Sequence, residues 1–253
     1  MCDVCGLFQC IAACPNYDPR KDPSVTGYCR ECGAPLYVDG SVLCVYCEKE
    51  YGTMHEIEFN SEKHEYTVDG EWVPCVSDIV SVYGKDVEEG DDLELRMDAA
   101  AERGTICHYI LASYLQGDRD VEYPSEYEPY VESINLFLSE HKLEPLAIET
   151  PVYSEKYGYA GTPDFLGHFD DVLTVLDWKF VRQLAKTKVK AQVNAYGAAY
   201  EEQNVWPDQL AAVQFLDDGT YRVYPVAYGV DELEAAVQVW KYKHQRHKRG
   251  EIS

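Results

Sequence analysis

The stretch YAGTPDFLGHFDDVLTVLDWKF, from Tyr159 to Phe180, alternates apolar and polar residues on both sides of an Asp-Asp pair. Alternation with a period of two is typical of strands, because successive side chains point to opposite faces. Asp170 and Asp171 suit a tight turn between two such strands. The stretch therefore predicts a hairpin of strands 163–169 and 172–180.

This hairpin carries charge where apolar side chains are expected. Counting outward from the turn places Asp164 opposite Asp177, and facing carboxylates repel each other. A divalent cation between them would remove that penalty, because hard oxygen ligands suit magnesium or manganese. Lys179 shares a face with Asp177 and could stabilise developing negative charge or orient a water, while Leu176 and Trp178 point into the packing on the other face. Taken alone, these residues are equally compatible with an exposed hairpin that carries a surface Asp–Lys pair.

The rest of the chain predicts an α/β (α+β) fold with a mixed central sheet flanked by helices. Residues 55–60 and 64–68 alternate, and Asp69-Gly70 signals a second hairpin. The other expected elements are helices from Ser77 and over 92–116, 125–143, 185–203 and 231–249, and strands over 147–155, 210–217 and 221–228.

Composition bounds the class of protein. The 253 residues are 46% hydrophobic with a formal net charge of −23. No run of eighteen apolar residues and no signal-peptide pattern occurs, so we expect a soluble cytoplasmic protein. The charge disfavours tight, non-specific duplex binding, although the local field at a site matters more than the total. The acidic run over 86–98 is expected to be a solvated loop or helix face.

Eight of the ten cysteines fall in the first 47 residues, mostly as CxxC pairs, which indicates metal in a reducing compartment. We therefore divide the chain into a zinc-binding module, 1–52, and a main domain, 53–253. The ligands expected of a four-cysteine zinc ribbon are Cys29, Cys32, Cys44 and Cys47, with an eleven-residue insert between the two pairs.

A second cysteine group precedes the ribbon and leaves several interpretations open. Its spacing is close to that of a zinc knuckle, and the alternatives are unligated thiols, an intermixed pairing with the ribbon, or an iron–sulfur cluster. Cys75 and Cys107 stand alone and are expected to be buried as small apolar residues. The members of the second group are Cys2, Cys5, Cys10 and Cys14.

Further polar residues occur in a distinctive order around the hairpin. The segments are GTICH (104–108), Glu149, GTPD (161–164), DWK (177–179) and QVNAY (192–196). In this order they resemble the RecB-type branch of the PD-(D/E)XK nuclease superfamily, including its phage-encoded and CRISPR-adaptation-type exonucleases. The hairpin segment over 64–80 resembles the leader of those proteins, and the likeness spans about 55–228.

The resemblance implies a restriction-endonuclease-like core and a role for each matching residue. Asp164, Asp177 and the backbone carbonyl of Trp178 would bind Mg²⁺ or Mn²⁺, with His108 as a further ligand. Lys179 would position or activate the attacking water, and Glu149 would assist through a water on the metal. Gln192 and Tyr196 would order the site and touch DNA.

The implied activity is metal-dependent hydrolysis of DNA phosphodiester bonds, by an exonuclease or end-processing enzyme of phage or mobile-element replication or recombination. A bacterial or archaeal host cell, or a virus-encoded protein, fits that setting. Alternatives are a structure-specific endonuclease and a non-catalytic scaffold that docks a partner through the zinc module. No membrane association is expected.

Local charge indicates where DNA could bind. A basic cluster without acidic neighbours leads from the hairpin into the next helix, and a second basic run closes the helix over 231–249. The second run equally suits helix-dipole complementation. The predicted DNA contacts in the first cluster, besides Lys179, are Arg182, Lys186, Lys188 and Lys190.

Overall fold

The computed structural model describes residues 27–28, 35–36, 55–61, 63–84 and 93–248. The chain divides into two compact units, Met1–His55 and Glu56–Ser253. In the first unit, β1 (Gly27–Tyr28) pairs antiparallel with β2 (Pro35–Leu36). All eight cysteines of the expected zinc module, and residues 86–92 of the acidic run, lie outside the described residues. None of the helices in the described part of the chain is long and apolar enough to cross a membrane.

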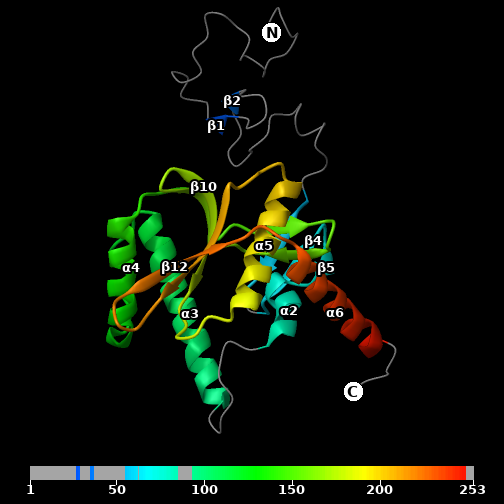
Figure 1. Ribbon diagram of the computed structural model, residues 1–253, viewed down its shortest axis with the longest axis horizontal. Coiled ribbons are helices and arrows are strands. Elements are labelled where there is room, and N and C mark those ends of the chain that lie inside the picture. The colour runs from blue at the N-terminus through cyan, green and yellow to red at the C-terminus, as the bar shows by residue number, and fades with distance from the viewer. Residues whose placement is uncertain (1–26, 29–34, 37–54, 62, 85–92, 249–253) are drawn as a thin grey trace, which may run out of the picture. The chain divides into compact units, whose positions relative to one another are not determined.

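A mixed five-stranded sheet forms the centre of the second unit (Figure 1), as predicted. One pair of neighbouring strands runs parallel and the other three neighbouring pairs are antiparallel. In spatial order the strands are β12 (Tyr221–Val226), β11 (Gln209–Phe215), β10 (Val172–Lys179), β9 (Phe165–Phe169) and β6 (Leu143–Ile148).

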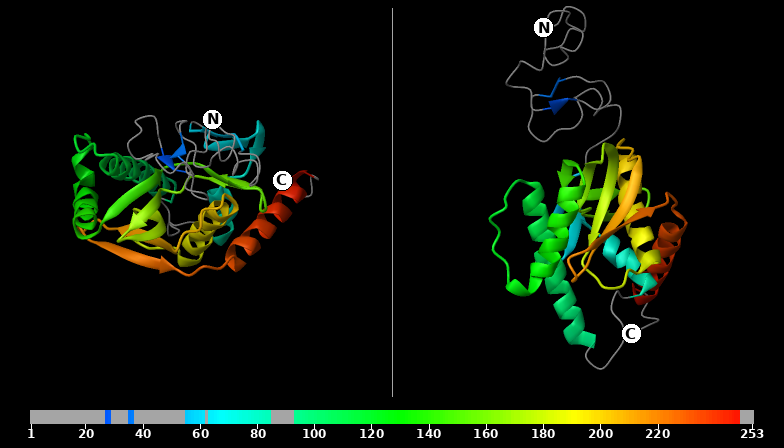
Figure 2. Two further views of the ribbon diagram at one scale, coloured as in Figure 1. Left: turned by 90° about the horizontal axis from the view of Figure 1, so that it is seen from above. Right: turned by 60° about the vertical axis from the view of Figure 1, so that its left-hand side comes forward.

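Helices cover both faces of this sheet, and each face has its own apolar core (Figures 1 and 2). Leu176 and Trp178 pack into the core under α3 and α4, whereas Val175 packs into the core under α2, α5 and α6. Asp177 and Lys179 alternate with Leu176 and Trp178 along β10, so the two pairs point to opposite faces, as predicted. The face of Asp177 and Lys179 is the one that α5 covers. The helices are α2 (Val76–Val80), α3 (Leu93–Leu115), α4 (Glu128–Glu140), α5 (Lys186–Glu202) and α6 (Asp231–Lys248), with 3₁₀ turns at Ser81–Tyr83 and Ser125–Tyr127.

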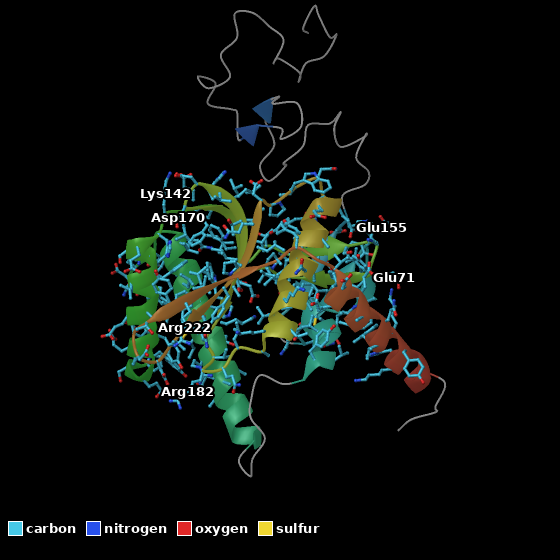
Figure 3. All side chains as sticks on the ribbon, in the orientation of Figure 1. Glu71, Lys142, Glu155, Asp170, Arg182 and Arg222 are labelled. Atoms are coloured by element: carbon cyan, nitrogen blue, oxygen red, sulfur yellow. The ribbon has the colours of Figure 1, made fainter. Side chains whose placement is uncertain are left out.

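The β9–β10 hairpin has the predicted register, from Val172 opposite Phe169 to Leu176 opposite Phe165. Its turn residues have positive φ angles, 49° and 69°, which aspartate tolerates and which match the right-handed strand twist. Asp170 also accepts a 2.9 Å hydrogen bond from the Lys142 backbone N–H. Figure 3 shows these two residues together at one end of the sheet and Arg182 at the other.

The segment between α4 and β9 differs from the prediction. The helix expected over 125–143 ends at Glu140, and Pro145 lies inside β6. This is possible because β6 is an edge strand with a register shift between Pro145 and Ala147, where a missing N–H does no harm. Gly167 faces this irregularity, and a Cβ there would meet the Glu144 carbonyl oxygen.

The single strand expected over 147–155 is also wrong. It is interrupted after Ile148, where Glu149 takes a φ of 47°, and resumes as β7 (Val152–Ser154). β7 leaves the central sheet and pairs with β8 (Tyr159–Gly161), a strand that the sequence pattern did not predict.

A separate three-stranded sheet precedes α2. It contains β3 (Ile57–Asn60), β4 (Glu65–Val68) and β5 (Glu71–Val73), with the predicted turn at Asp69-Gly70. Tyr66 and Val68 pack with Cys75 and Ala160, and the Ala160 N–H donates to the Pro74 carbonyl at 3.0 Å. The small sheet is thus attached to β8, which ends three residues before Asp164.

Candidate active site

The polar residues of the motifs meet around one cavity of about 450 Å³. They come from five elements or loops that are distant in the sequence and converge at the end of the hairpin opposite its turn. The predicted site residues that line the cavity are His108, Glu149, Asp164, Asp177, Lys179, Gln192 and Tyr196.

Three of these side chains form a compact group of metal-ligating atoms. One atom each from His108, Glu149 and Asp164 lies within 4.8 Å of the other two. His108 Nδ1 is 2.9 Å from Asp164 Oδ1 and 3.7 Å from Glu149 Oε1. The Glu149 N–H also donates to the Asp164 carbonyl at 3.2 Å, so the kink after β6 carries Glu149 to this group.

Asp164 is fixed by the neighbouring strand. Its Oδ2 accepts a 2.6 Å hydrogen bond from the Trp178 backbone N–H. This contact lies just beyond Leu176 and Phe165, the last residues paired between β10 and β9. The Trp178 side chain is 1% exposed on the opposite face. The strand therefore uses its backbone to orient one carboxylate while its side chain anchors the sheet in the core.

Asp177 lines the same cavity as Asp164 and is paired with a lysine. Its Oδ2 lies 2.7 Å from Lys179 Nζ, and within the described residues it has no hydrogen-bond partner beyond this ion pair. Lys179 Nζ also donates to Gln192 Oε1 at 3.1 Å, and Gln192 Nε2 donates to the Tyr196 hydroxyl at 3.0 Å. A chain of polar contacts thus runs from β10 to α5.

Burial and neighbouring charge perturb the site. Burial raises the pKa of Asp177 above its ordinary value, although Lys179 opposes this effect. Burial alone would lower the pKa of His108, but the charge of Asp164 and hydrogen bonds to Asp164 and Glu149 outweigh it and raise the pKa to about 10. Burial also raises the pKa of Tyr196. Strongly perturbed groups that gather in one cavity are typical of functional sites.

The basic residues after β10 are placed away from this cavity. Arg182 is 2.7 Å from Asp217 and Lys190 is 2.6 Å from Glu232, so two predicted DNA contacts have acidic partners. Lys186 is exposed and Lys188 partly so in the first turn of α5. Side chains of the basic end of α6, from residue 245 onward, lie outside the described residues.

Several lining residues were not assigned from the sequence. Phe59, His64 and Tyr66 reach the cavity from the small sheet, and Thr162 binds the Tyr66 hydroxyl at 2.7 Å. Gly161 has a steric role, because a Cβ there would lie 2.7 Å from Val76 Cγ2. The leader hairpin over 64–80 and the GTPD segment were the sequence signals that included some of these residues. Neither signal showed that their side chains would reach the cavity, because a local pattern does not tell which strands approach it.

Comparison with known proteins yields no family. No family model and no curated protein matches the sequence. An alkaline exonuclease from Laribacter hongkongensis is 13% identical, with a TM-score of 0.31 over 70% of this chain and 92% of that chain. A protein provisionally described as an exonuclease, from Eubacterium rectale, is 11% identical, with a TM-score of 0.44 over 72% of this chain and 83% of that chain. With both TM-scores below 0.5, neither likeness establishes a common fold.

Proposed function

We propose that this chain is a metal-dependent DNA nuclease that hydrolyses phosphodiester bonds, acting as an exonuclease or end-processing enzyme. The observation that carries this proposal is the convergence on one cavity of a His–Glu–Asp group with a buried aspartate–lysine pair. The carboxylates would bind a cation, and the lysine beside them would contact the reacting phosphate. This combination suits hydrolysis of an anionic substrate. The resemblance to RecB-type nucleases supports DNA as that substrate.

The residues fit a divalent cation. His108, Glu149 and Asp164 would supply one nitrogen and two carboxylate ligands, and the Asp177 carboxylate, paired with Lys179, lines the same cavity. Carboxylates suit Mg²⁺ or Mn²⁺, and the imidazole favours Mn²⁺ because nitrogen is the softer ligand. When bound, such a cation stabilises charge on the phosphate and lowers the pKa of a water.

The protein's own groups would orient the reaction. Lys179 is held beside Asp177 and Gln192, so its ammonium group is fixed without requiring the substrate to order it. There it would stabilise the negative charge that develops on the phosphate oxygens as water attacks phosphorus and the bond to the leaving oxygen breaks. The Trp178 N–H keeps Asp164 oriented throughout.

We further propose that the first unit binds one or two structural zinc ions and docks substrate or a replication or recombination partner. The cysteine spacing supports this, as does the pairing of β1 and β2 on either side of Cys29 and Cys32 in the sequence. Metal analysis of the purified chain tests the zinc: a protein without bound zinc, or unchanged zinc in Cys29→Ser/Cys32→Ser, would refute it.

The nuclease proposal is tested with end-labelled single- and double-stranded DNA in magnesium, in manganese and without divalent cation. We expect metal-dependent cleavage that falls at least about a hundredfold in Asp177→Ala and in Lys179→Ala. The product ladder then separates stepwise removal of nucleotides from internal cutting.

Lys142→Ala is the matched control, because this lysine also pairs with an aspartate but lies at the turn end of the hairpin. It should cleave like wild type. Absence of cleavage by folded wild-type protein on every substrate would refute the proposal and favour a non-catalytic scaffold.

A further inference from the structure

One wall of the cavity is aromatic and has no part in the proposed hydrolysis. Phe59 and Tyr66 are paired across β3 and β4, with ring centroids 4.6 Å apart and planes inclined by 30°. His64 meets Phe59 edge-on at 5.3 Å. All three line the cavity, and Phe59 remains 39% exposed, so its ring is only partly used in packing.

This aromatic wall is fixed relative to the metal-ligating group. Tyr66 is 3% exposed, and its hydroxyl lies 2.7 Å from Thr162 Oγ1, two residues before Asp164. Cys75 pairs with Ala160 in an isolated bridge that joins the small sheet to β8. Phe59 therefore packs on the Tyr66 ring, and Tyr66 is hydrogen-bonded to the segment that carries Asp164.

The charges around the cavity make a non-ionic contact with the substrate important. Three carboxylates line it, and the one lysine among its lining residues is 2.7 Å from Asp177. Phosphate attraction alone is thus a weak source of affinity here. Stacking on an aromatic ring is independent of charge, and every base offers a π-face.

We propose, building on the nuclease function above, that Phe59, backed by Tyr66 and flanked by His64, stacks a base of an unpaired DNA strand. Inside a duplex both faces of an internal base are covered by its neighbours, and only the outermost pair has a free face, so a ring that lines a cavity stacks most readily on an unpaired base. The substrate class of this site is therefore a single strand or a frayed single-stranded end. The cavity volume of about 450 Å³ is within the range of pockets that hold small ligands.

The test is equilibrium binding without added magnesium or manganese, followed by fluorescence anisotropy. The probes are a labelled short oligothymidylate and a labelled abasic oligonucleotide of the same length, which keeps the phosphates and lacks the bases. In Phe59→Ala we expect the affinity for oligothymidylate to fall by about five- to a hundredfold, with abasic binding unchanged. Phe59→Trp should restore binding.

Two further variants guard against trivial effects. Phe59→Leu keeps apolar bulk but lacks a π-face, so it should bind oligothymidylate as weakly as Phe59→Ala while melting like wild type. Trp206→Ala removes a 63% exposed ring that does not line the cavity and should bind like wild type.

The outcomes separate this proposal from the nuclease proposal. Wild-type affinity of Phe59→Ala for oligothymidylate, or an equal loss for the abasic strand, would overturn the stacking role even if Lys179-dependent cleavage is present. Base-dependent binding that requires Phe59, in a protein that never cleaves, would support stacking and refute hydrolysis.

Discussion

The position of Lys179 illustrates how single contacts prepare the site. Its ammonium group meets Asp177 on its own strand and Gln192 on α5, and Gln192 is in turn bonded to Tyr196. Tyr196 is 5% exposed, so the far end of this chain is anchored in the core. We therefore propose Gln192 as a positioning residue, since it contacts the lysine from the helix.

Gln192→Ala should therefore lower kcat by about ten- to a hundredfold, the range for a lost hydrogen bond to a charged group. Tyr196→Phe keeps the ring and removes only a neutral partner, so a loss of about threefold to tenfold is expected. The measurements are kcat and KM for cleavage, with Mn²⁺ binding by calorimetry as the check. A change in Mn²⁺ affinity with kcat intact would show that Gln192 serves the metal group instead.

At the scale of elements, the β9–β10 hairpin has the proposed metal-binding carboxylates, Asp164 and Asp177, at one end and is held by hydrogen bonds at the other. At the turn, Asp170 accepts hydrogen bonds from the Lys142 N–H at 2.9 Å and pairs with His141 at 2.6 Å. These contacts tie the turn to the residues that lead into β6. The edge strand is thereby kept in register with the hairpin.

The contribution of Asp170 should depend on pH in a defined direction. The Lys142 N–H, and then His141, lower the folded-state pKa of Asp170 below its ordinary 3.8. A lowered folded pKa means that the stabilisation is present above about pH 4 and is lost as the pH falls through the lowered value. Asp170→Asn, which tolerates the positive φ, should reduce the unfolding free energy at pH 7 by about 0.5–1 kcal/mol after solvent screening.

Urea denaturation at pH 7 and at progressively lower pH measures this difference. The gap between wild type and Asp170→Asn should close below pH 4. Asp171→Asn is the matched control, because Asp171 is 78% exposed and pairs with the Lys142 side chain, so it should change stability less. A gap that persists unchanged at low pH would contradict the role of the carboxylate charge.

At the scale of the whole molecule, a net charge of −23 sets the conditions for DNA binding. Two of the cations after β10, Arg182 and Lys190, have acidic partners, which reduces the charge that they offer to phosphate. The proposed DNA binding should then depend strongly on short-range contacts within the cavity. This agrees with the stacking role proposed for Phe59.

We therefore expect a shallow salt dependence for single-stranded DNA. Between 50 and 200 mM salt the affinity should fall by about tenfold or less, compared with about 10³–10⁵-fold for a protein with six to ten phosphate contacts. Anisotropy titrations across this range provide the slope. A steep slope would contradict this expectation and show that several basic residues contact the phosphates.

The sequence by itself determined most of the helices and strands and the hairpin register. Alternation of apolar residues is a local property, and the Asp-Asp turn sets the pairing of β9 with β10 residue by residue. For the same reason, the faces of Asp177 and Lys179 followed from counting. Burial of Cys75 and Cys107 was also predictable, because isolated cysteines behave as small apolar residues.

Only the tertiary structure decided which segments meet. A local pattern carries no information about the kink at Glu149, which depends on a hydrogen bond to the Asp164 carbonyl. Likewise, Pro145 reads as a helix stop until β6 is known to be an edge strand. The division of labour between Asp164, beside His108, and Asp177, beside Lys179, arises because side chains choose partners across elements. Those partners are brought together by packing, which sequence periodicity does not encode.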